Sequence, residues 1–179
     1  MTTCPDAEFT ALIDRQARFV FQVAYAVLLN AHDAEDAAQE TFLKLYRNHG
    51  WRNAQNERAF LARVAWRTAI DMRRGAVGAK TSSIEPLSAS SAAFDVASPR
   101  PGPEQTVLEA NQHAVIHSMI DALPEELRVP LTLSATNELT SREIAEILGI
   151  PDGTVRTRLQ RARQMLLQKL AATQEMRHA

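Results

Sequence analysis

Five cationic side chains and no acidic one occupy the stretch between Gly153 and Gln174. Guanidinium and ammonium groups can neutralise backbone phosphates, and an arginine can also read the edge of a guanine. A charge run can equally do no more than keep one face of a helix in water. The five cations are Arg156, Arg158, Arg161, Arg163 and Lys169. Which of the two interpretations applies depends on the secondary-structure elements that hold them.

The residues before this stretch predict two short helices separated by a tight break. Thr140 and Glu143 have the spacing of a capping box, in which each side chain satisfies a backbone donor at the helix start. Gly149 can end that helix in a left-handed conformation, Pro151 prevents it from continuing, and Asp152 is placed to cap the next helix. Such a pair, with a basic second helix, is typical of a helix-turn-helix that enters the DNA major groove. The second helix is expected to bury Val155, Leu159, Ala162, Leu166 and Leu170.

The composition predicts an all-α protein of one or two small domains. The chain has 179 residues, of which 45% are hydrophobic and only 6 are glycine, and its apolar residues recur at helical spacing. Its formal net charge is −1. A protein that binds DNA tightly on its own normally carries a positive excess, because phosphate neutralisation supplies most of the affinity. We therefore expect a larger partner to share the binding.

Nothing in the sequence indicates secretion, catalysis, a cofactor or a metal site. Cys4 is the only cysteine, and the N-terminus lacks the basic and apolar regions of a signal peptide. Glu109, His113 and His117 are spaced to line one helix face, but no fourth ligand is apparent, so they are not expected to bind a metal. No glycine-rich phosphate loop or activated nucleophile is present. We expect a cytoplasmic protein that is not an enzyme.

Three helices are expected in the N-terminal part of the chain. Apolar residues from Phe9 to Leu28 recur every three or four positions, which indicates one long helix or two end to end. Residues 30–32 break this pattern, and Asp33 is placed to cap a second helix. A third helix is expected from about Glu57 to Arg74, with its arginines outward. The second helix is expected to bury Ala37, Thr41, Phe42 and Leu45.

A change in composition divides the chain into two parts. Residues 76–103 are rich in Ser, Ala, Gly and Pro and contain few large apolar residues. Such a segment cannot bury enough surface to offset the entropy lost on ordering, so it is predicted to be a flexible linker. It separates two expected small helical domains, residues 1–75 and residues 104–179. In the second domain Pro130 falls inside an expected helix and should kink or shorten it.

Three segments, in this order, resemble bacterial sigma factors of the extracytoplasmic-function (ECF) group of the sigma-70 family. Residues 33–47, DAEDAAQETFLKLYR, are similar to the helix that grips the clamp of the largest RNA polymerase subunit. Residues 60–74, FLARVAWRTAIDMRR, are similar to the helix that reads and melts the −10 promoter element. Residues 123–134, LPEELRVPLTLS, with the helix-turn-helix, are similar to the domain that reads the −35 element and touches the polymerase flap.

The resemblance implies a promoter-specific initiation factor whose partners are core RNA polymerase, promoter DNA and an anti-sigma factor. It implies polymerase binding by Asp36, Gln39, Glu40 and Lys44. Recognition of the −10 element is implied for Asn53, Arg63, Trp66, Arg67, Arg73 and Arg74, and the loop around Trp51 is expected to offer further stacking surface for an extruded base. Contact with the −35 element is implied for Ser141, Arg142, Arg156, Thr157, Gln160 and Arg161.

Two positions depart from the pattern of the family, and one other function remains open. Arg67 stands where the family often has asparagine, which leaves the −10 preference open, and Pro130 stands where an apolar helix former is usual. A stand-alone helix-turn-helix regulator would share the C-terminal motif. Such a regulator generally needs a dimer seam, and the sequence has no sustained heptad pattern. The acidic helix at residues 33–40 and the long linker favour the sigma factor.

Overall fold

The computed structural model describes residues 5–79, 114–137 and 139–178, and within these ranges every regular element is a helix. The N-terminal half consists of α1 (Pro5–Leu28), α2 (Ala31–Asn48), the short 3-10 helix η1 (Gly50–Asn53) and α3 (Glu57–Ala79). The C-terminal half begins with a helical segment at residues 114–121. It continues with α5 (Glu125–Asn137), α6 (Ser141–Leu148) and α7 (Asp152–His178). The all-helical prediction is confirmed.

Leu29 and Asn30 set the boundary between the first two helices. Helix α1 is one continuous helix from Pro5 to Leu28. It ends because Leu29 has a left-handed backbone, with φ of 53°. The side-chain oxygen of Asn30 accepts a hydrogen bond from the backbone N–H of Asp33 at 3.1 Å. Asn30 therefore caps α2, and the prediction that Asp33 is the cap was wrong. Asp33 lies instead in the first turn, where the helix dipole favours its charge.

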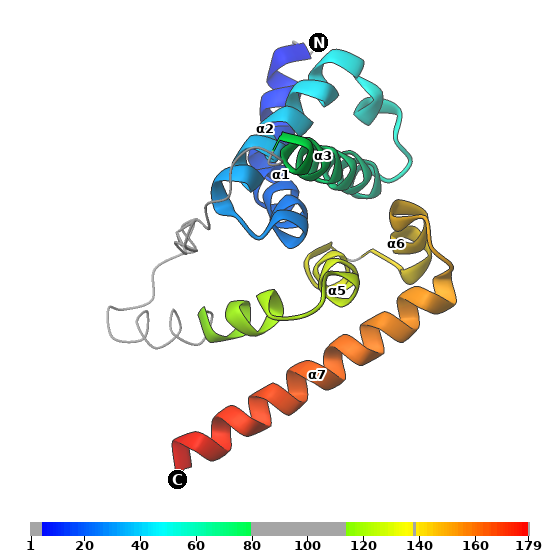
Figure 1. Ribbon diagram of the computed structural model, residues 1–179. Helices are drawn as coiled ribbons and strands as arrows, with labels where there is room; N and C mark the ends of the chain where they lie inside the picture. The colour runs from blue at the N-terminus through cyan, green and yellow to red at the C-terminus, as the bar shows by residue number, and fades with distance from the viewer. Residues whose placement is uncertain (1–4, 80–113, 138, 179) are drawn as a thin grey trace, which may run out of the picture.

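The three N-terminal helices pack on one another around an apolar interior. Helix α1 lies against both α2 and α3, and α2 lies against α3 (Figure 1). All four residues that the sequence predicted to face inward on α2 are buried. Helix α3 reaches Ala79 rather than Arg74, so it includes the first four residues of the predicted linker, residues 76–103, whose other residues lie outside the described ranges.

The first helix of the helix-turn-helix has the local geometry that its sequence predicts, but the start of the second differs. Thr140 and Glu143 form a capping box at the start of α6, and Gly149 ends that helix with φ of 67°. The N–H groups of Thr154 and Val155 then bond to the carbonyl of Pro151, so α7 starts one residue earlier than a cap at Asp152 would allow. The Asp152 carboxylate instead pairs with Arg156 of its own helix. The prediction that Asp152 caps this helix was therefore wrong.

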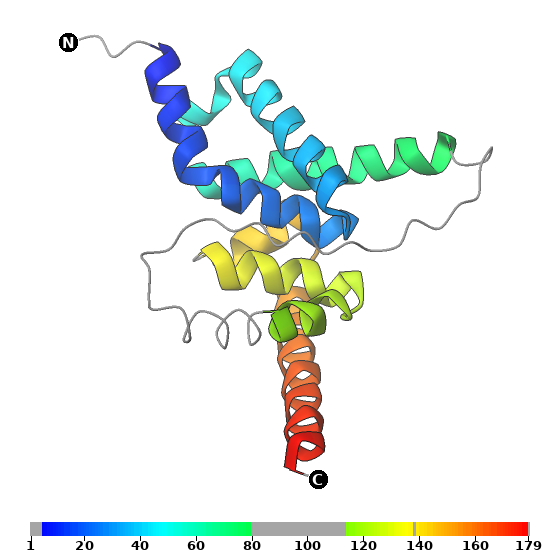
Figure 2. The same cartoon turned by 90° about the vertical axis from the view of Figure 1, so that its left-hand side faces the viewer.

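The buried face of α7 is shorter than the sequence predicts. Val155, Leu159 and Ala162 are buried, but Leu166 is half-buried and Leu170 is exposed. Figures 1 and 2 both show the reason, because the C-terminal part of α7 extends away from the rest of the molecule. The prediction that the buried face reaches Leu170 was therefore wrong.

Pro130 does not end the helix that contains it. Helix α5 runs without interruption from Glu125 to Asn137, with Pro130 fully buried in its second turn. The carbonyl that loses its partner is that of Glu126, four residues earlier, and Glu126 is exposed to water. Pro130 therefore does not shorten the helix, which was one of the two outcomes expected of it.

The two halves of the molecule pack against each other. Helix α1 lies against α5, and α3 lies against α6 (Figure 2). The buried side chains of both halves form one continuous core. The guanidinium of Arg128, a residue with 5% exposure, donates to the main-chain carbonyl of Ala26 at 2.8 Å. It also donates to the carbonyls of Leu123 and Asp121, at 2.7 and 3.2 Å. One buried cation thus joins α1 to the start of the C-terminal half.

A second polar contact lies beside Arg128. The hydroxyl of Tyr25 donates to the Asp121 carboxylate at 3.1 Å. Burial, together with the neighbouring Asp121 charge, raises the pKa of Tyr25, and burial also lowers the pKa of Arg128. Both shifts reflect groups that have left water when the two halves meet.

Removing the hydroxyl of the capping box should destabilise the helix-turn-helix. Replacing Thr140 with alanine leaves the Glu143 N–H at the start of α6 without its acceptor. We expect the free energy of unfolding to fall by about 1 kcal/mol. Urea unfolding followed by circular dichroism measures this loss. Thr140→Ser, which keeps the hydroxyl, is the control, and an equal loss in both variants would contradict the capping role.

The capping box should also make stability depend on pH. Two hydrogen bonds from Thr140, one from its N–H and one from its hydroxyl, lower the pKa of Glu143 below its ordinary value of 4.5. A carboxyl whose pKa is lowered on folding stabilises the fold above its unfolded pKa, and this contribution is lost as the pH falls through the folded pKa. Glu143→Gln cannot ionise, so its difference in unfolding free energy from the parent should shrink below about pH 4.5. A difference that stays constant through this range would contradict the prediction.

Candidate nucleic-acid interface

The N-terminal turns of α7 present a polar face to solvent. Arg156, Thr157, Gln160 and Arg161 are all exposed, whereas the neighbouring Val155 and Leu159 are buried on the side of α7 that packs on α5 and α6. This division follows from helical periodicity. Thr157, Gln160 and Arg161 follow Arg156 by one, four and five positions, which places all four on one side of the helix. The face combines two guanidinium groups with an amide and a hydroxyl, which are groups that read base edges in the major groove.

Two local contacts hold parts of this face in place. Nη2 of Arg156 lies 2.6 Å from a carboxylate oxygen of Asp152, one turn earlier. The Thr157 hydroxyl donates to the carbonyl of Gly153 at 2.9 Å. The Arg156 side chain nevertheless remains 71% exposed, so it can exchange its partner for a phosphate or a base.

Ser141 and Arg142 stand at the start of α6, the first helix of the motif. Ser141 is half-buried, and the Arg142 side chain is 86% exposed, with Nε 3.8 Å from Glu146 Oε1. The first turn of a helix carries unpaired N–H groups and the positive end of the helix dipole, both of which attract phosphate. The two residues therefore lie where a DNA backbone can be held.

The residues predicted to read the −10 element fall into two groups. Asn53, Arg67 and Arg74 are exposed. Arg63, Trp66 and Arg73 lie on the side of α3 that faces the C-terminal half, where Arg73 forms an ion pair with Glu125 of α5.

Arg63 and Trp66 are also turned toward the C-terminal half. Arg63 Nη2 lies 3.9 Å from Glu146 Oε2 of α6. Trp66 is half-buried and borders a cavity of about 290 Å³, whose opposite wall includes Val129, Pro130 and Leu148. The sequence alone gave no indication that these side chains would have partners inside the chain.

Trp51 does not provide the expected stacking surface. Its side chain is 8% exposed and belongs to the core, with its ring 6.1 Å from that of Phe9. The guanidinium of Arg52 lies 5.3 Å from the centre of the indole. The expectation that Trp51 offers a free face to a base was therefore wrong.

The residues predicted to bind polymerase lie on α2 in different settings. Asp36 is exposed, with a carboxylate oxygen 3.6 Å from His32 Nδ1. Glu40 is partly exposed and lies 4.0 Å from the Lys44 ammonium. Lys44 donates to the hydroxyl of the buried Thr68 at 3.1 Å, so this lysine joins α2 to α3.

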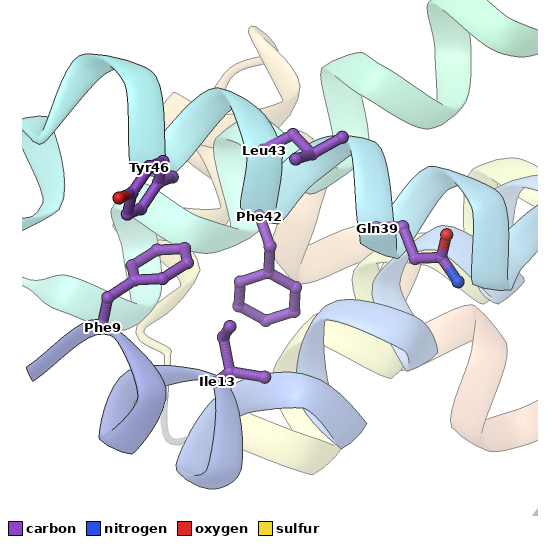
Figure 3. Close-up of a pocket in the computed structure, with 6 residues that line it drawn as sticks. All are labelled: Phe9, Ile13, Gln39, Phe42, Leu43 and Tyr46. Carbon is purple, nitrogen blue, oxygen red and sulfur yellow. The ribbon is translucent and has the colours of Figure 1, made fainter. Parts of the chain in front are cut away.

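Gln39 borders an apolar groove between α1 and α2 that sequence reasoning missed. The groove has a volume of about 370 Å³. Figure 3 shows Gln39 at one end, the rings of Phe9 and Tyr46 at the other, and Ile13 and Phe42 between them. Leu43 and Tyr46 are 49% and 45% exposed although both are large and apolar. The sequence does hold a signal for this groove, because Leu43 and Tyr46 are large apolar residues that lie off the buried stripe of α2.

No helix in the described ranges is long and apolar enough to cross a membrane. Those ranges also hold no group of three potential metal-ligating side chains. Glu109 and His113, which the sequence places on one helix face with His117, lie outside the described residues.

Two family models, one for each half of the molecule, match this chain. Residues 12–77 match Sigma-70 region 2, and residues 113–166 match Sigma-70, region 4. The first range contains most of α1 and all of α2, and the second contains the helix-turn-helix. The two matched regions thus coincide with the two packed halves.

Curated relatives extend this match over most of the chain. The ECF RNA polymerase sigma factor SigW of Bacillus subtilis is 32% identical over 168 residues, which cover 90% of this chain and 88% of SigW. The ECF RNA polymerase sigma factor SigE of Mycolicibacterium smegmatis is 32% identical over 163 residues, and the match spans 89% of this chain and 60% of that protein. The RNA polymerase sigma-H factor of Pseudomonas aeruginosa is 35% identical over 146 residues, covering 76% of this chain and 72% of the relative.

Solved structures share the fold. CnrH in complex with the cytosolic domain of CnrY aligns with a TM-score of 0.59 at 22% identity, covering 93% of this chain and 90% of that one. The sigma factor RpoE of Bartonella quintana, in complex with the anti-sigma factor NepR, aligns with a TM-score of 0.66 at 18% identity and covers 92% and 97%. The matches to both regions and to the curated relatives show that this chain belongs to the ECF RNA polymerase sigma factors of the sigma-70 family, which recognise the −10 promoter element through region 2 and bind the −35 element through region 4.

Proposed function

We propose that the −35 element is read by the polar face at the start of α7 and held by the start of α6. The observation that carries this assignment is the exposure of four polar side chains on a stretch of α7 that has no acidic residue between Gly153 and Gln174, with Ser141 and Arg142 at the preceding helix start. Arg156 and Arg161 can each make a bidentate contact to guanine, and Gln160 can make one to adenine. The remaining groups position the duplex through its phosphates.

For the −10 element we propose that α3 and the loop before it bind one DNA strand. Arg63, Arg73 and Arg74 would contact phosphates, and Trp66 would stack on an extruded base. Asn53 supplies an amide for base recognition, and Arg67 supplies a guanidinium where the family often has asparagine. All six residues proposed for this element, Arg67 included, come from η1 and α3.

Core RNA polymerase is proposed to bind the exposed face of α2. Asp36, Gln39 and Glu40 offer acidic and amide groups to a basic partner helix, and the adjoining groove offers apolar surface at Leu43 and Tyr46. Lys44 belongs to the same set but contributes mainly by holding α2 on α3, since its ammonium is bonded to Thr68.

An anti-sigma factor is proposed as a further partner, and the cytoplasm as the compartment. Both solved neighbours, CnrH and RpoE, were determined as complexes, RpoE with a named anti-sigma factor. A protein that covered the groove beside Gln39 would compete with polymerase for the same surface. Binding to core RNA polymerase requires that the chain act where transcription takes place.

Transcription in vitro tests the proposed function as a whole. The purified chain, added to core RNA polymerase and genomic DNA fragments, should start transcripts at defined positions that core polymerase alone does not use. If no fragment gives a start that depends on the chain, the proposed function is wrong.

Removing the arginines of α7 should weaken promoter recognition without weakening polymerase binding. Arg156→Ala and Arg161→Ala each remove a contact worth about 1–3 kcal/mol, so the holoenzyme should bind a −35 duplex at least roughly fivefold more weakly. Fluorescence anisotropy with a labelled promoter duplex measures this change. Lys169→Ala, which removes the same charge about two turns beyond Arg161 on α7, is the control. A loss of affinity for core polymerase in the arginine variants would contradict the division of labour.

Removing the exposed leucine beside Gln39 should weaken polymerase binding. Leu43→Ser takes apolar surface from the groove without opening the core, because the side chain is already half exposed. We expect the Kd for core polymerase to rise roughly tenfold, a change of about 1.4 kcal/mol. Leu29→Asn is a matched control, since Leu29 is a similarly exposed leucine outside the groove whose left-handed backbone asparagine tolerates. Equal effects of the two variants would contradict the assignment of the groove.

A further inference from the structure

One carboxylate lies beside the polar face at the start of α7. Asp152 belongs to the first turn of that helix, and its Oδ2 lies 2.6 Å from Nη2 of Arg156. An acid at this position repels the DNA phosphates that the surrounding cations attract. The carboxylate does not cap the helix either, so its interaction in the described part of the chain is the one with Arg156.

The Asp152 carboxylate depends on Arg156 for its partner. Its Oδ1 is buried and, among the described residues, accepts no hydrogen bond. Its Oδ2 is the atom that Arg156 approaches. If Arg156 left for a phosphate, both oxygens would lack a protein partner beside the negative DNA backbone, and a carboxylate in that state is costly. Release of Arg156 from Asp152 on DNA binding is therefore unfavourable.

Arg156 can contact DNA without leaving Asp152. The ion pair uses one N–H group of Nη2, and a guanidinium carries several more in the same plane. The Arg156 side chain is 71% exposed, so these groups are open to a ligand. A guanine edge offers two acceptors, N7 and O6, to two N–H groups of one arginine. The same guanidinium can thus bind Asp152 and a guanine together.

An arginine held in place is better suited to a base than to a phosphate. A free arginine side chain has many rotamers, and a two-bond contact with guanine requires one particular orientation of its plane. An ion pair that fixes the side chain before binding lowers the entropy lost when the base is bound. The Asp152 charge also repels any phosphate that approaches the same guanidinium.

We propose that Asp152 is a positioning residue for promoter recognition, which holds the Arg156 guanidinium toward one guanine of the −35 element. This inference rests on the proposed assignment of Arg156 to that element. Arg161, the other arginine of the face, has Thr157 and Met165 one turn away on either side, and neither is acidic. The base preference of Arg156 therefore depends on Asp152, whereas that of Arg161 does not.

Selection from a random pool of DNA tests the proposal. The full-length chain, bound to core RNA polymerase, selects from duplexes randomised over about ten base pairs, one helical turn. Sequencing of the bound DNA gives the preference at each position, and Arg156→Ala and Arg161→Ala identify the base pair that each arginine reads. Asp152→Asn, which keeps the shape of the side chain, should lower the preference for guanine at the Arg156 position roughly threefold. The Arg161 position should not change.

Overall affinity separates positioning from damage to the helix. Asp152→Asn removes a negative charge close to DNA, so a duplex without the selected sequence should bind at least as tightly as it binds to the parent. A variant with a damaged helix would lose affinity for every duplex. Asp152→Glu, which restores a carboxylate, should recover part of the lost guanine preference. Weaker binding of all duplexes by Asp152→Asn, with the preference intact, would refute the positioning role.

Glu146→Gln is the matched control. Glu146 lies one turn after Arg142 on α6, with Oε1 3.8 Å from Arg142 Nε, and Arg142 is assigned to phosphate rather than to a base. The substitution removes the same charge from the same motif. Because phosphate contacts carry no sequence information, the base preferences of this variant should equal those of the parent. A loss of guanine preference as large as that in Asp152→Asn would show a general charge effect and overturn the proposal.

The ordering of Arg156 can be measured without DNA. In the free chain, nitrogen NMR relaxation at Arg156 Nε reports the fast motion of the side chain, and the signal missing from Arg156→Ala identifies it. Asp152→Asn should lower the order parameter at this atom and leave that of Arg161 unchanged. An order parameter that does not respond to the substitution would mean that Asp152 does not hold the side chain, and the proposal would be wrong.

The outcomes separate this inference from the proposed function. If Arg156→Ala loses a base preference that Asp152→Asn keeps, the positioning role is wrong and the assignment of α7 to the −35 element stands. If the parent selects no sequence, or Arg156→Ala changes no preference, the assignment of Arg156 fails and the inference fails with it.

Discussion

The guanidinium of Arg128 is the contact on which the arrangement of the two regions depends. A buried cation is costly unless its hydrogen bonds are met, and here three main-chain carbonyls meet them. Ala26 and Asp121 each lie close to the end of a helix, where carbonyls lack partners and the helix dipole is negative. Arg128 therefore fixes the end of α1 against the start of region 4, and this placement brings α6 and α5 to the side of α3 that carries Arg63 and Arg73.

Much of the local structure could be predicted because it depends on residues three or four positions apart. The capping box at Thr140, the left-handed Gly149 and the buried stripe of α2 are all of this kind. The errors arose where a neighbouring residue or the wider fold decided the outcome. Asn30 offered an earlier cap than Asp33, and Leu170 lies beyond the point where α7 leaves the core. The contact between the regions could not be predicted, since Arg128 and Ala26 are 102 positions apart and nothing in either residue marks it as a partner.

The candidate site shows the same division. The exposed face of α7 follows from periodicity once the turn at Gly149 is identified. The partners of Lys44, the burial of Trp51 and the pairing of Arg73 with Glu125 depend on how separate helices meet, so residue type and spacing could not give them. Gln39 is a polar residue in the segment that resembles the polymerase-binding helix, whereas the apolar groove beside it depends on how α1 and α2 pack together.

The carboxylate of Glu143 belongs to two structures at once. It closes the capping box that begins α6, and it accepts a hydrogen bond from Asn56, which precedes α3 in region 2. The first turn of the −35 motif and the entrance to the −10 helix therefore share a single side chain. Substitutions at this residue should be pleiotropic, since the contact between the two regions and the integrity of the DNA-reading motif would change together.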